Sequence, residues 1–118
     1  MSNEHDPWRD LLKRADESQA RLEEVDRSLS DPAVSKVPAR LRDLGKERSD
    51  LEPIVTAATR LRRTLTAMSE AEELIANSSD ADLVELARGE LEEARGAVEA
   101  EAQALRELLI PRDPNDDK

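Results

Sequence analysis

Apolar residues recur at alternating intervals of three and four through most of this 118-residue chain, which is the spacing of one face of an α-helix. The first run of such positions consists of Trp8, Leu11, Ala15, Ser18, Leu22, Val25 and Leu29. Asp6 can cap the start of this helix, and Pro7 suits its first position. Pro32 disfavours helical angles at the residue before it, so we expect the helix to end at Asp31.

A second helical pattern follows a short linker, residues 31–37, and Pro38 suits its first position. The face it predicts consists of Val37, Leu41, Leu44, Arg48 and Leu51, and then of Ile54, Ala58, Leu61, Leu65, Met68 and Ile75. The step after Leu51 inserts an extra interval of three, which shifts the phase of the pattern. Pro53 lies at this step and has no N–H to donate to the carbonyl of Ser49. We therefore expect a bend at Pro53 or a break between two helices.

A third helical pattern follows the polar sequence Asn77-Ser78-Ser79, and either Ser79 or Asp80 can cap its start. Ser79 and Asp82 also have the spacing of a capping box, in a weaker version. The predicted face consists of Val84, Ala87, Leu91, Ala94, Val98, Glu101, Leu105 and Leu108. Pro111 ends the pattern.

The short connections require neighbouring helices to run antiparallel. The second and third helices should form a hairpin with residues 77–79 at its tip, and the first helix should lie against the beginning of the second. The chain should then leave at the end opposite the tip, beside the linker. We predict an all-α fold, an elongated antiparallel three-helix coiled-coil-like bundle, over residues 1–110. Its thin, Ala-rich core predicts modest stability and favours self-association of the isolated chain.

Composition agrees with long helices and excludes several classes of protein. Charged residues make up 39% of the chain and the mean hydropathy is −0.74, but the regular spacing of the apolar residues argues against disorder. The absence of Cys and the single His exclude disulfides, thiolate catalysis and paired-His zinc sites. The acidic N-terminus does not resemble a signal peptide, and no apolar run is long enough for a membrane span. We expect a cytoplasmic protein with no membrane partner.

No arrangement of side chains predicts an active site. The adjacent pairs Glu23-Glu24, Glu72-Glu73 and Glu92-Glu93 project in different directions on a helix, so they are interpreted as surface residues rather than acid/base pairs. The three glycines are too far apart to form a phosphate-binding loop. His5 is interpreted as inert, and Trp8 as a packing anchor rather than a partner contact. We expect no catalytic residue, metal or cofactor.

Charge is divided unequally between the two halves of the chain. Residues 1–65 carry 13 acidic and 13 basic residues, whereas residues 66–118 carry 15 acidic and 5 basic residues and so hold the whole net charge of −10. An acidic surface repels the phosphates of nucleic acids, because binding them needs Lys and Arg. The acidic half is interpreted mainly as a solvated helix face, with attraction of a basic partner as the alternative.

Basic residues concentrate in the second helix: Arg40, Arg42, Lys46, Arg48, Arg60, Arg62 and Arg63. Ion pairs with the acidic third helix are one interpretation, and phosphate contacts with folded RNA are the other. A binding site for single-stranded nucleic acid is not predicted, because no aromatic side chain lies among them. Arg60, Arg62 and Arg63 are the candidate partner contacts.

Five short segments carry a further signal through their order and spacing: residues 29–34, 45–55, 71–75, 86–91 and 108–118. Together they resemble the first domain of bacterial class-one peptide chain release factors. The last segment, Leu-Leu-Ile-Pro-Arg-Asp-Pro-Asn-Asp-Asp-Lys, is the most specific. It resembles the type-one branch, which reads UAA and UAG, more than the UGA-reading branch. Arg48 stands where the family commonly has an aromatic residue, and Gly45 where it commonly has Ser; both departures concern packing.

The resemblance implies a parent protein that binds the ribosome at a stop codon and promotes hydrolysis of peptidyl-tRNA through a Gly-Gly-Gln motif. This chain contains neither Gly-Gly-Gln nor the codon-reading Pro-x-Thr, so we expect a docking domain that is not itself an enzyme. Residues 111–118 would begin the linker to the codon-reading and catalytic domains. The implied partners are the stalk base and GTPase-associated region of the large ribosomal subunit, and the class-two release factor GTPase.

An alternative interpretation is a stand-alone coiled-coil protein that serves as a scaffold or oligomerisation element. Its helix faces would then meet identical chains, and its mass would rise with concentration. Residues 112–118 favour the release-factor interpretation, because a free-standing rod has no need of a linker-like sequence.

Overall fold

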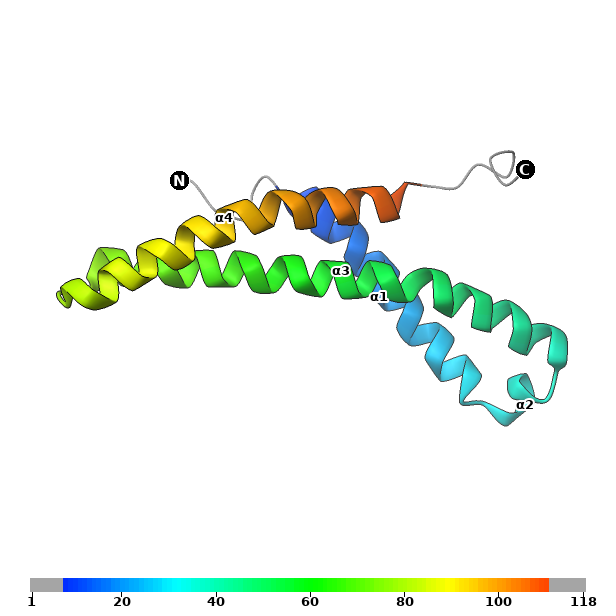
Figure 1. Ribbon diagram of the computed structural model, residues 1–118. Helices are drawn as coiled ribbons and strands as arrows, with labels where there is room; N and C mark the ends of the chain where they lie inside the picture. The colour runs from blue at the N-terminus through cyan, green and yellow to red at the C-terminus, as the bar shows by residue number, and fades with distance from the viewer. Residues whose placement is uncertain (1–7, 111–118) are drawn as a thin grey trace.

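The computed structural model describes residues 8–110, and all four elements in this part are helices. They are α1 (Arg9–Leu29), α2 (Pro32–Ser35), α3 (Pro38–Asn77) and α4 (Ala81–Leu109). The molecule is a rod with principal extents of 62 × 34 × 24 Å (Figure 1). The predicted all-α class is confirmed for the described residues.

The long hairpin of α3 and α4 forms the body of the rod, and α1 crosses α3 near its middle (Figure 1). α4 runs back along α3 from the turn after Asn77, as predicted, and α1 packs mainly on α3. Helices α1, α3 and α4 meet only in the central part. One end of the rod is therefore the α3–α4 hairpin tip, and the other is made of α1, α2 and the start of α3.

The end of α4 lies beside the first half of α1, where an Arg14 Nη2 donates to the carbonyl oxygen of Leu109 at 3.0 Å. The prediction that the chain leaves beside the linker 31–37 is therefore wrong. The reason is length, because α4 has 29 residues and α3 has 40, so α4 ends before it reaches the start of α3.

Helix α1 begins at Arg9, later than predicted, with Trp8 in the N-cap position, where the Trp8 side chain makes no capping hydrogen bond. The predicted cap and first residue, Asp6 and Pro7, lie outside the described residues. The helix ends at Leu29, shortly before Pro32, as the restriction on the residue before a proline requires.

The linker after α1 contains a helical turn, α2, that the apolar pattern did not reveal. The Asp31 carboxylate accepts a hydrogen bond from the N–H of Ala33 at 2.9 Å, and Pro32 occupies the first helical position. This local capping sequence makes the turn without any apolar periodicity. Pro38 begins α3 in the same way, as predicted.

Helix α3 is continuous over its 40 residues, so the predicted break at Pro53 is wrong. Pro53 leaves the carbonyl of Ser49 without its usual helical donor, which weakens one turn. In Figure 1 the first part of α3 slopes away from the line of the remainder, which agrees with the alternative prediction of a bend. α1 contacts α3 on both sides of Pro53, where Asp26 and Asp16 pair with Arg48 and Arg62.

The core is a thin layer in which the predicted faces of three helices meet. Its buried members are Leu11, Leu12, Ala15, Ala58, Leu61, Leu65, Met68, Ala71, Ala87, Leu91, Val98, Ala102 and Leu105. The predicted Ala-rich character is confirmed, since Ala supplies many of these positions.

Three residues assigned to these faces are exposed instead. Val37 and Leu41 are 41% and 44% exposed, because α4 ends too early to cover the start of α3, and Leu108 is 42% exposed. In the last turns of α4 the buried side is completed by Ala102, which the pattern did not include.

Replacing Asp80 with Ala is expected to lower the free energy of unfolding by about 1 kcal/mol, because Asp80 caps α4. Its carboxylate accepts from the N–H groups of Asp82 and Leu83, at 3.0 and 3.3 Å, and so satisfies two donors with no helical partner. Urea denaturation checks this value. Ser79→Ala is the control, because the side chain that caps α4 is that of Asp80 and not that of Ser79. An equal loss of stability in Ser79→Ala would contradict the assignment of Asp80 as the cap.

Candidate interaction surface

The three candidate arginines on α3 have different environments. Arg62 turns toward α1, where its Nη2 donates to the carbonyl oxygen of Leu12 at 3.2 Å and forms an ion pair with Asp16. Arg62 therefore holds α1 against α3. Arg60 and Arg63 are exposed and make no such contact with other described residues.

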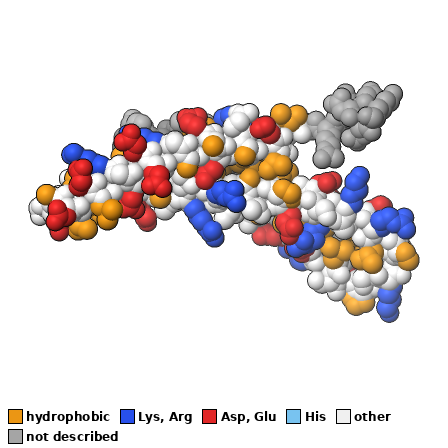
Figure 2. Space-filling model, viewed as in Figure 1, with side chains coloured by type: hydrophobic (Ala, Val, Ile, Leu, Met, Phe, Trp, Pro, Cys, Tyr) orange, Lys and Arg blue, Asp and Glu red, His pale blue; other side chains and the backbone are white. Residues whose placement is uncertain are grey.

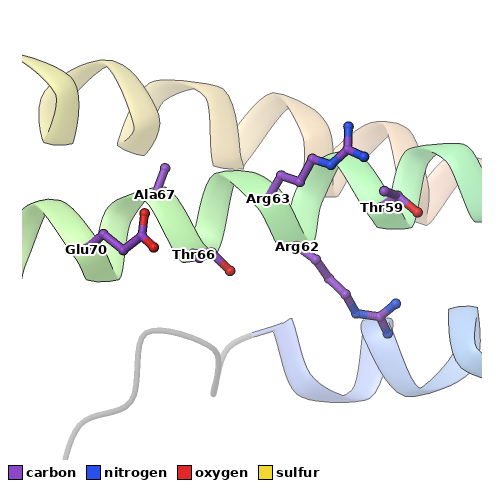
Figure 3. Close-up of a pocket in the computed structure, with 6 residues that line it drawn as sticks. All are labelled: Thr59, Arg62, Arg63, Thr66, Ala67 and Glu70. Carbon is purple, nitrogen blue, oxygen red and sulfur yellow. The ribbon is translucent and has the colours of Figure 1, made fainter.

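A shallow groove of about 310 Å³ runs along α3 beside these arginines. It is lined by Thr59, Arg62, Arg63, Thr66, Ala67 and Glu70 (Figure 3). In Figure 3 Arg62 extends toward α1, whereas Arg63 lies on the opposite side of α3. The groove presents threonine hydroxyls, a guanidinium and a carboxylate on one open face, which suits surface contact rather than enclosure of a small molecule.

Arg63 also borders two neighbouring grooves. One of them lies between α3 and α4 and includes Glu90 and Glu93, and the other is lined by Arg60 and Thr56. Arg63 therefore lies at the junction of several surface grooves. Of the three arginines, Arg60 and Arg63 are accessible to a partner, while Arg62 is engaged within the fold.

The prediction that the basic residues of α3 pair with the acidic last helix is wrong for the two arginines whose partners are seen. Arg48 Nε donates to Asp26 at 2.8 Å, and Arg62 pairs with Asp16; both of these carboxylates belong to α1. The acidic residues of α1 are closer to these arginines because α1, rather than α4, covers that side of α3. One ion pair between α3 and α4 joins Glu72 to Arg95, at 3.7 Å.

A further ion pair joins α1 to α3 through two hydrogen bonds. Arg21 Nη2 donates to Glu47 Oε1 at 2.8 Å, and Arg21 Nε donates to Glu47 Oε2. The hydrogen bond from Arg21 lowers the pKa of Glu47 below its ordinary value of 4.5 and raises the pKa of Arg21. The hydrogen bond of Arg48 to Asp26 likewise raises the pKa of Arg48.

The Arg21–Glu47 pair should make stability depend on pH in one direction. Because the folded-state pKa of Glu47 lies below its unfolded value, the pair stabilises the fold above pH 4.5 and loses its effect as the pH falls through the folded-state pKa. Glu47→Gln is expected to be less stable than the original chain at neutral pH, and the small difference should vanish on acidification. Urea midpoints across this range measure it.

Glu24→Gln is the control for this pair, since Glu24 lies at 3.8 Å from Arg21 and accepts no hydrogen bond from it. A stability difference for Glu47→Gln that grows on acidification would contradict the assigned pKa shift.

Charge separates along the rod. In Figure 2 acidic side chains crowd the hairpin of α3 and α4, and basic side chains gather around α2 and the start of α3. The hairpin tip also exposes leucines that the sequence patterns did not single out as surface: Leu74, Leu83 and Leu86, at 38%, 46% and 63%. Leu83 and Leu86 lie off the predicted apolar face of their helix, and this position was the sequence signal that they are exposed.

Trp8 packs against the core and carries the guanidinium of Arg106 over its ring, 5.9 Å from the centroid. Its interpretation as a packing anchor is supported by this contact, which ties the start of α1 to the last turns of α4. His5 lies outside the described residues.

Residues 8–110 carry neither a metal-binding group nor a membrane-spanning helix. In this range no group of three or more His, Asp or Glu side chains is placed to hold a metal ion. Every described helix is too short or too polar to span a lipid bilayer.

Comparison with known proteins gives a consistent result. A family model described as the PCRF domain matches residues 18–118. Peptide chain release factor 1 of Bacillus licheniformis is 36% identical over 92% of this chain and 30% of the relative, and that of Anaeromyxobacter dehalogenans is 39% identical over 92% and 29%. The protein of the same name from Streptococcus agalactiae is 40% identical over 83% of the chain and 28% of the relative.

The chain thus spans less than a third of the length of these curated relatives. No solved structure matches it.

Proposed function

The chain belongs to the PCRF domain family, and from this membership we propose that it is the N-terminal docking domain of a peptide chain release factor of type one. The parent protein would recognise UAA and UAG on the ribosome and promote hydrolysis of peptidyl-tRNA, in the cytoplasm. The observation that carries the proposal is the similarity to peptide chain release factor 1 along nearly the whole chain.

The domain itself would be non-catalytic. Its sequence has no Gly-Gly-Gln, and its surface between residues 8 and 110 offers shallow grooves and ion pairs rather than a group of residues fit for hydrolysis. A rod of 62 Å suits the task of projecting a contact surface away from a catalytic body. Residues 1–110 would form this arm, and residues 111–118 would begin the linker to the rest of the protein.

The contacts would be with the stalk base and GTPase-associated region of the large ribosomal subunit and with the class-two release factor GTPase. Arg60 and Arg63 support this part of the proposal, because both are exposed and border open grooves. Arg62 would contribute by holding α1 in place. The stand-alone scaffold is the less favoured candidate, since its only support is the self-association expected of a thin core.

A chimera tests the proposal. This chain replaces the matching stretch of Bacillus licheniformis peptide chain release factor 1, and peptide release is measured on purified ribosomes stalled at UAA, UAG or UGA. We expect release at UAA and UAG, stimulation of turnover by the class-two GTPase, and no release by the isolated 118-residue chain. Release by the isolated chain would refute the non-catalytic role, and a chimera insensitive to the GTPase would refute the docking role.

The arginines are tested in the same chimera. Arg60→Glu with Arg63→Glu should slow multiple turnover while leaving single-turnover release unchanged, because docking rather than chemistry is affected. Arg88→Glu, on the exposed side of α4, is the control for an added negative charge. An equal effect of Arg88→Glu would show that overall charge, and not this surface, is responsible.

A further inference from the structure

The end of the rod opposite the hairpin tip has a charge opposite to that of the molecule. We call residues 27–48 the basic foot; they carry six Lys or Arg and three Asp or Glu, whereas the whole chain has a net charge of −10. Two of the three carboxylates are already engaged, Asp31 in capping α2 and Glu47 with Arg21. The foot therefore has a net positive charge, in a molecule that is otherwise acidic.

Most cations of the basic foot are available to a partner. Arg27, Lys36, Arg40, Arg42 and Lys46 are all exposed, and none of them forms an ion pair with another described residue. Arg48 differs, since it is held by Asp26 and Glu52.

The placement of these cations is suited to the phosphate backbone of a nucleic-acid duplex. Lys36 follows the last residue of α2 as its C-cap, while Arg40, Arg42 and Lys46 lie in the first turns of α3. Arg42 and Lys46 are four residues apart and share a side of α3, whereas Arg40 projects from another side. Cations on several sides of one end can reach phosphates on both strands of a duplex.

Recognition of bases is not provided at the foot. The only aromatic residue of the chain, Trp8, packs against the other end of α1, so no ring is available for bases to stack on. The exposed apolar side chains, Val37 and Leu41, are each less than half exposed and form too small an area for the apolar centre of a protein interface. Phosphate contact without base readout is how double-stranded RNA is mostly bound.

We propose that the basic foot binds the phosphate backbone of double-stranded RNA through Lys36, Arg40, Arg42 and Lys46. The proposal rests on the proposed function in so far as the RNA met in the cell would be ribosomal. The acidic hairpin of α3 and α4 is repelled by the same RNA. The rod therefore touches the duplex with one end and directs its hairpin tip, with Leu83 and Leu86, away from it.

Direct titration of the 118-residue chain against a labelled RNA duplex of about 16 base pairs tests the proposal without any release assay. Binding is measured by fluorescence anisotropy between ~50 and ~200 mM salt. The foot variant combines K36Q, R40Q, R42Q and K46Q. The control variant combines K13Q and R88Q, at exposed positions outside both the foot and the proposed docking surface; it is compared with a foot variant that carries K36Q and R42Q alone, which changes the net charge equally.

The foot variant is expected to lose at least about tenfold in affinity at ~50 mM salt, and its salt dependence should be shallower by about one unit of slope for each lost contact. The control variant should lose much less. A single strand of the same length should bind more weakly than the duplex. Because the substituted side chains form no ion pair with other residues between positions 8 and 110, helical circular dichroism should stay unchanged in all three variants.

Several outcomes would overturn the proposal. They are the absence of duplex binding at ~50 mM salt, an equal loss in the control variant, and single-strand binding as tight as duplex binding. Binding of an acidic polypeptide such as polyglutamate in preference to the duplex would assign the foot to a protein partner instead. Each of these leaves the chimera result intact, so failure of the foot and failure of the docking role are distinguishable.

Discussion

Leu65→Ala is expected to lower the free energy of unfolding by about 3 kcal/mol, which is the largest effect of a single substitution that we predict. Leu65 is completely buried in the core cluster, at 0% exposure. Its truncation removes apolar contacts and leaves a cavity, and both terms destabilise the fold. In a rod whose core is one thin layer, few neighbours can move to fill the space. Urea denaturation followed by circular dichroism gives the value.

Leu86→Ala is the matched control, because the same atoms are removed from a side chain that is 63% exposed. We expect a change within about 0.5 kcal/mol. A loss below about 1 kcal/mol for Leu65→Ala would contradict the packing of α3 in the core. A large loss for Leu86→Ala would show that the hairpin tip is covered in solution, as in self-association.

Pro53→Ala is expected to stabilise the protein, by up to about 3 kcal/mol. Pro53 lies in the interior of α3 and is exposed, so no buried contact is lost on substitution. Alanine restores the N–H that can donate to the carbonyl of Ser49 and removes the clash of the proline ring with that turn. Thermal and urea denaturation both report the gain.

Pro38→Ala is the control for this prediction. Pro38 occupies the first position of α3, where a missing N–H costs nothing and the fixed backbone angle is favourable. The substitution should therefore be neutral or slightly destabilising. If Pro53→Ala destabilised the protein instead, the bend would be needed to keep α1 and α4 packed on the same helix, and the tertiary contacts would outweigh the local gain.

The candidate arginines illustrate how far a sequence can predict a site. The positions of the basic residues along the sequence predict the cluster on α3, and two of its members, Arg60 and Arg63, are exposed. The engagement of Arg62 by Leu12 and Asp16 was not predictable, since it depends on where α1 crosses α3. The sequence does not reveal whether a basic residue pairs with a carboxylate of the same chain or is left for another molecule.

Three helices and most of the buried face follow from the sequence, because each depends on residues within a few positions of one another. The cap of α4 is narrowed by the sequence to Ser79 or Asp80, and the structure shows that it is Asp80. The spacing of apolar residues predicts the face of a helix, and Pro38 predicts where α3 begins. Family membership also follows from short segments in order, without the fold.

Only the tertiary structure decided which parts of these helices cover one another, because the helices are long and differ in length. Because α4 is shorter than α3, Val37 and Leu41 stay exposed and the end of α4 lies beside Arg14. The side of α3 near Arg48 is covered by α1 instead. Continuity through Pro53 was decided in the same way, because packing of α3 on α1 and α4 outweighs one lost hydrogen bond. Periodicity reports the direction in which a residue points, but the neighbour that covers it is set by contacts between distant parts of the chain.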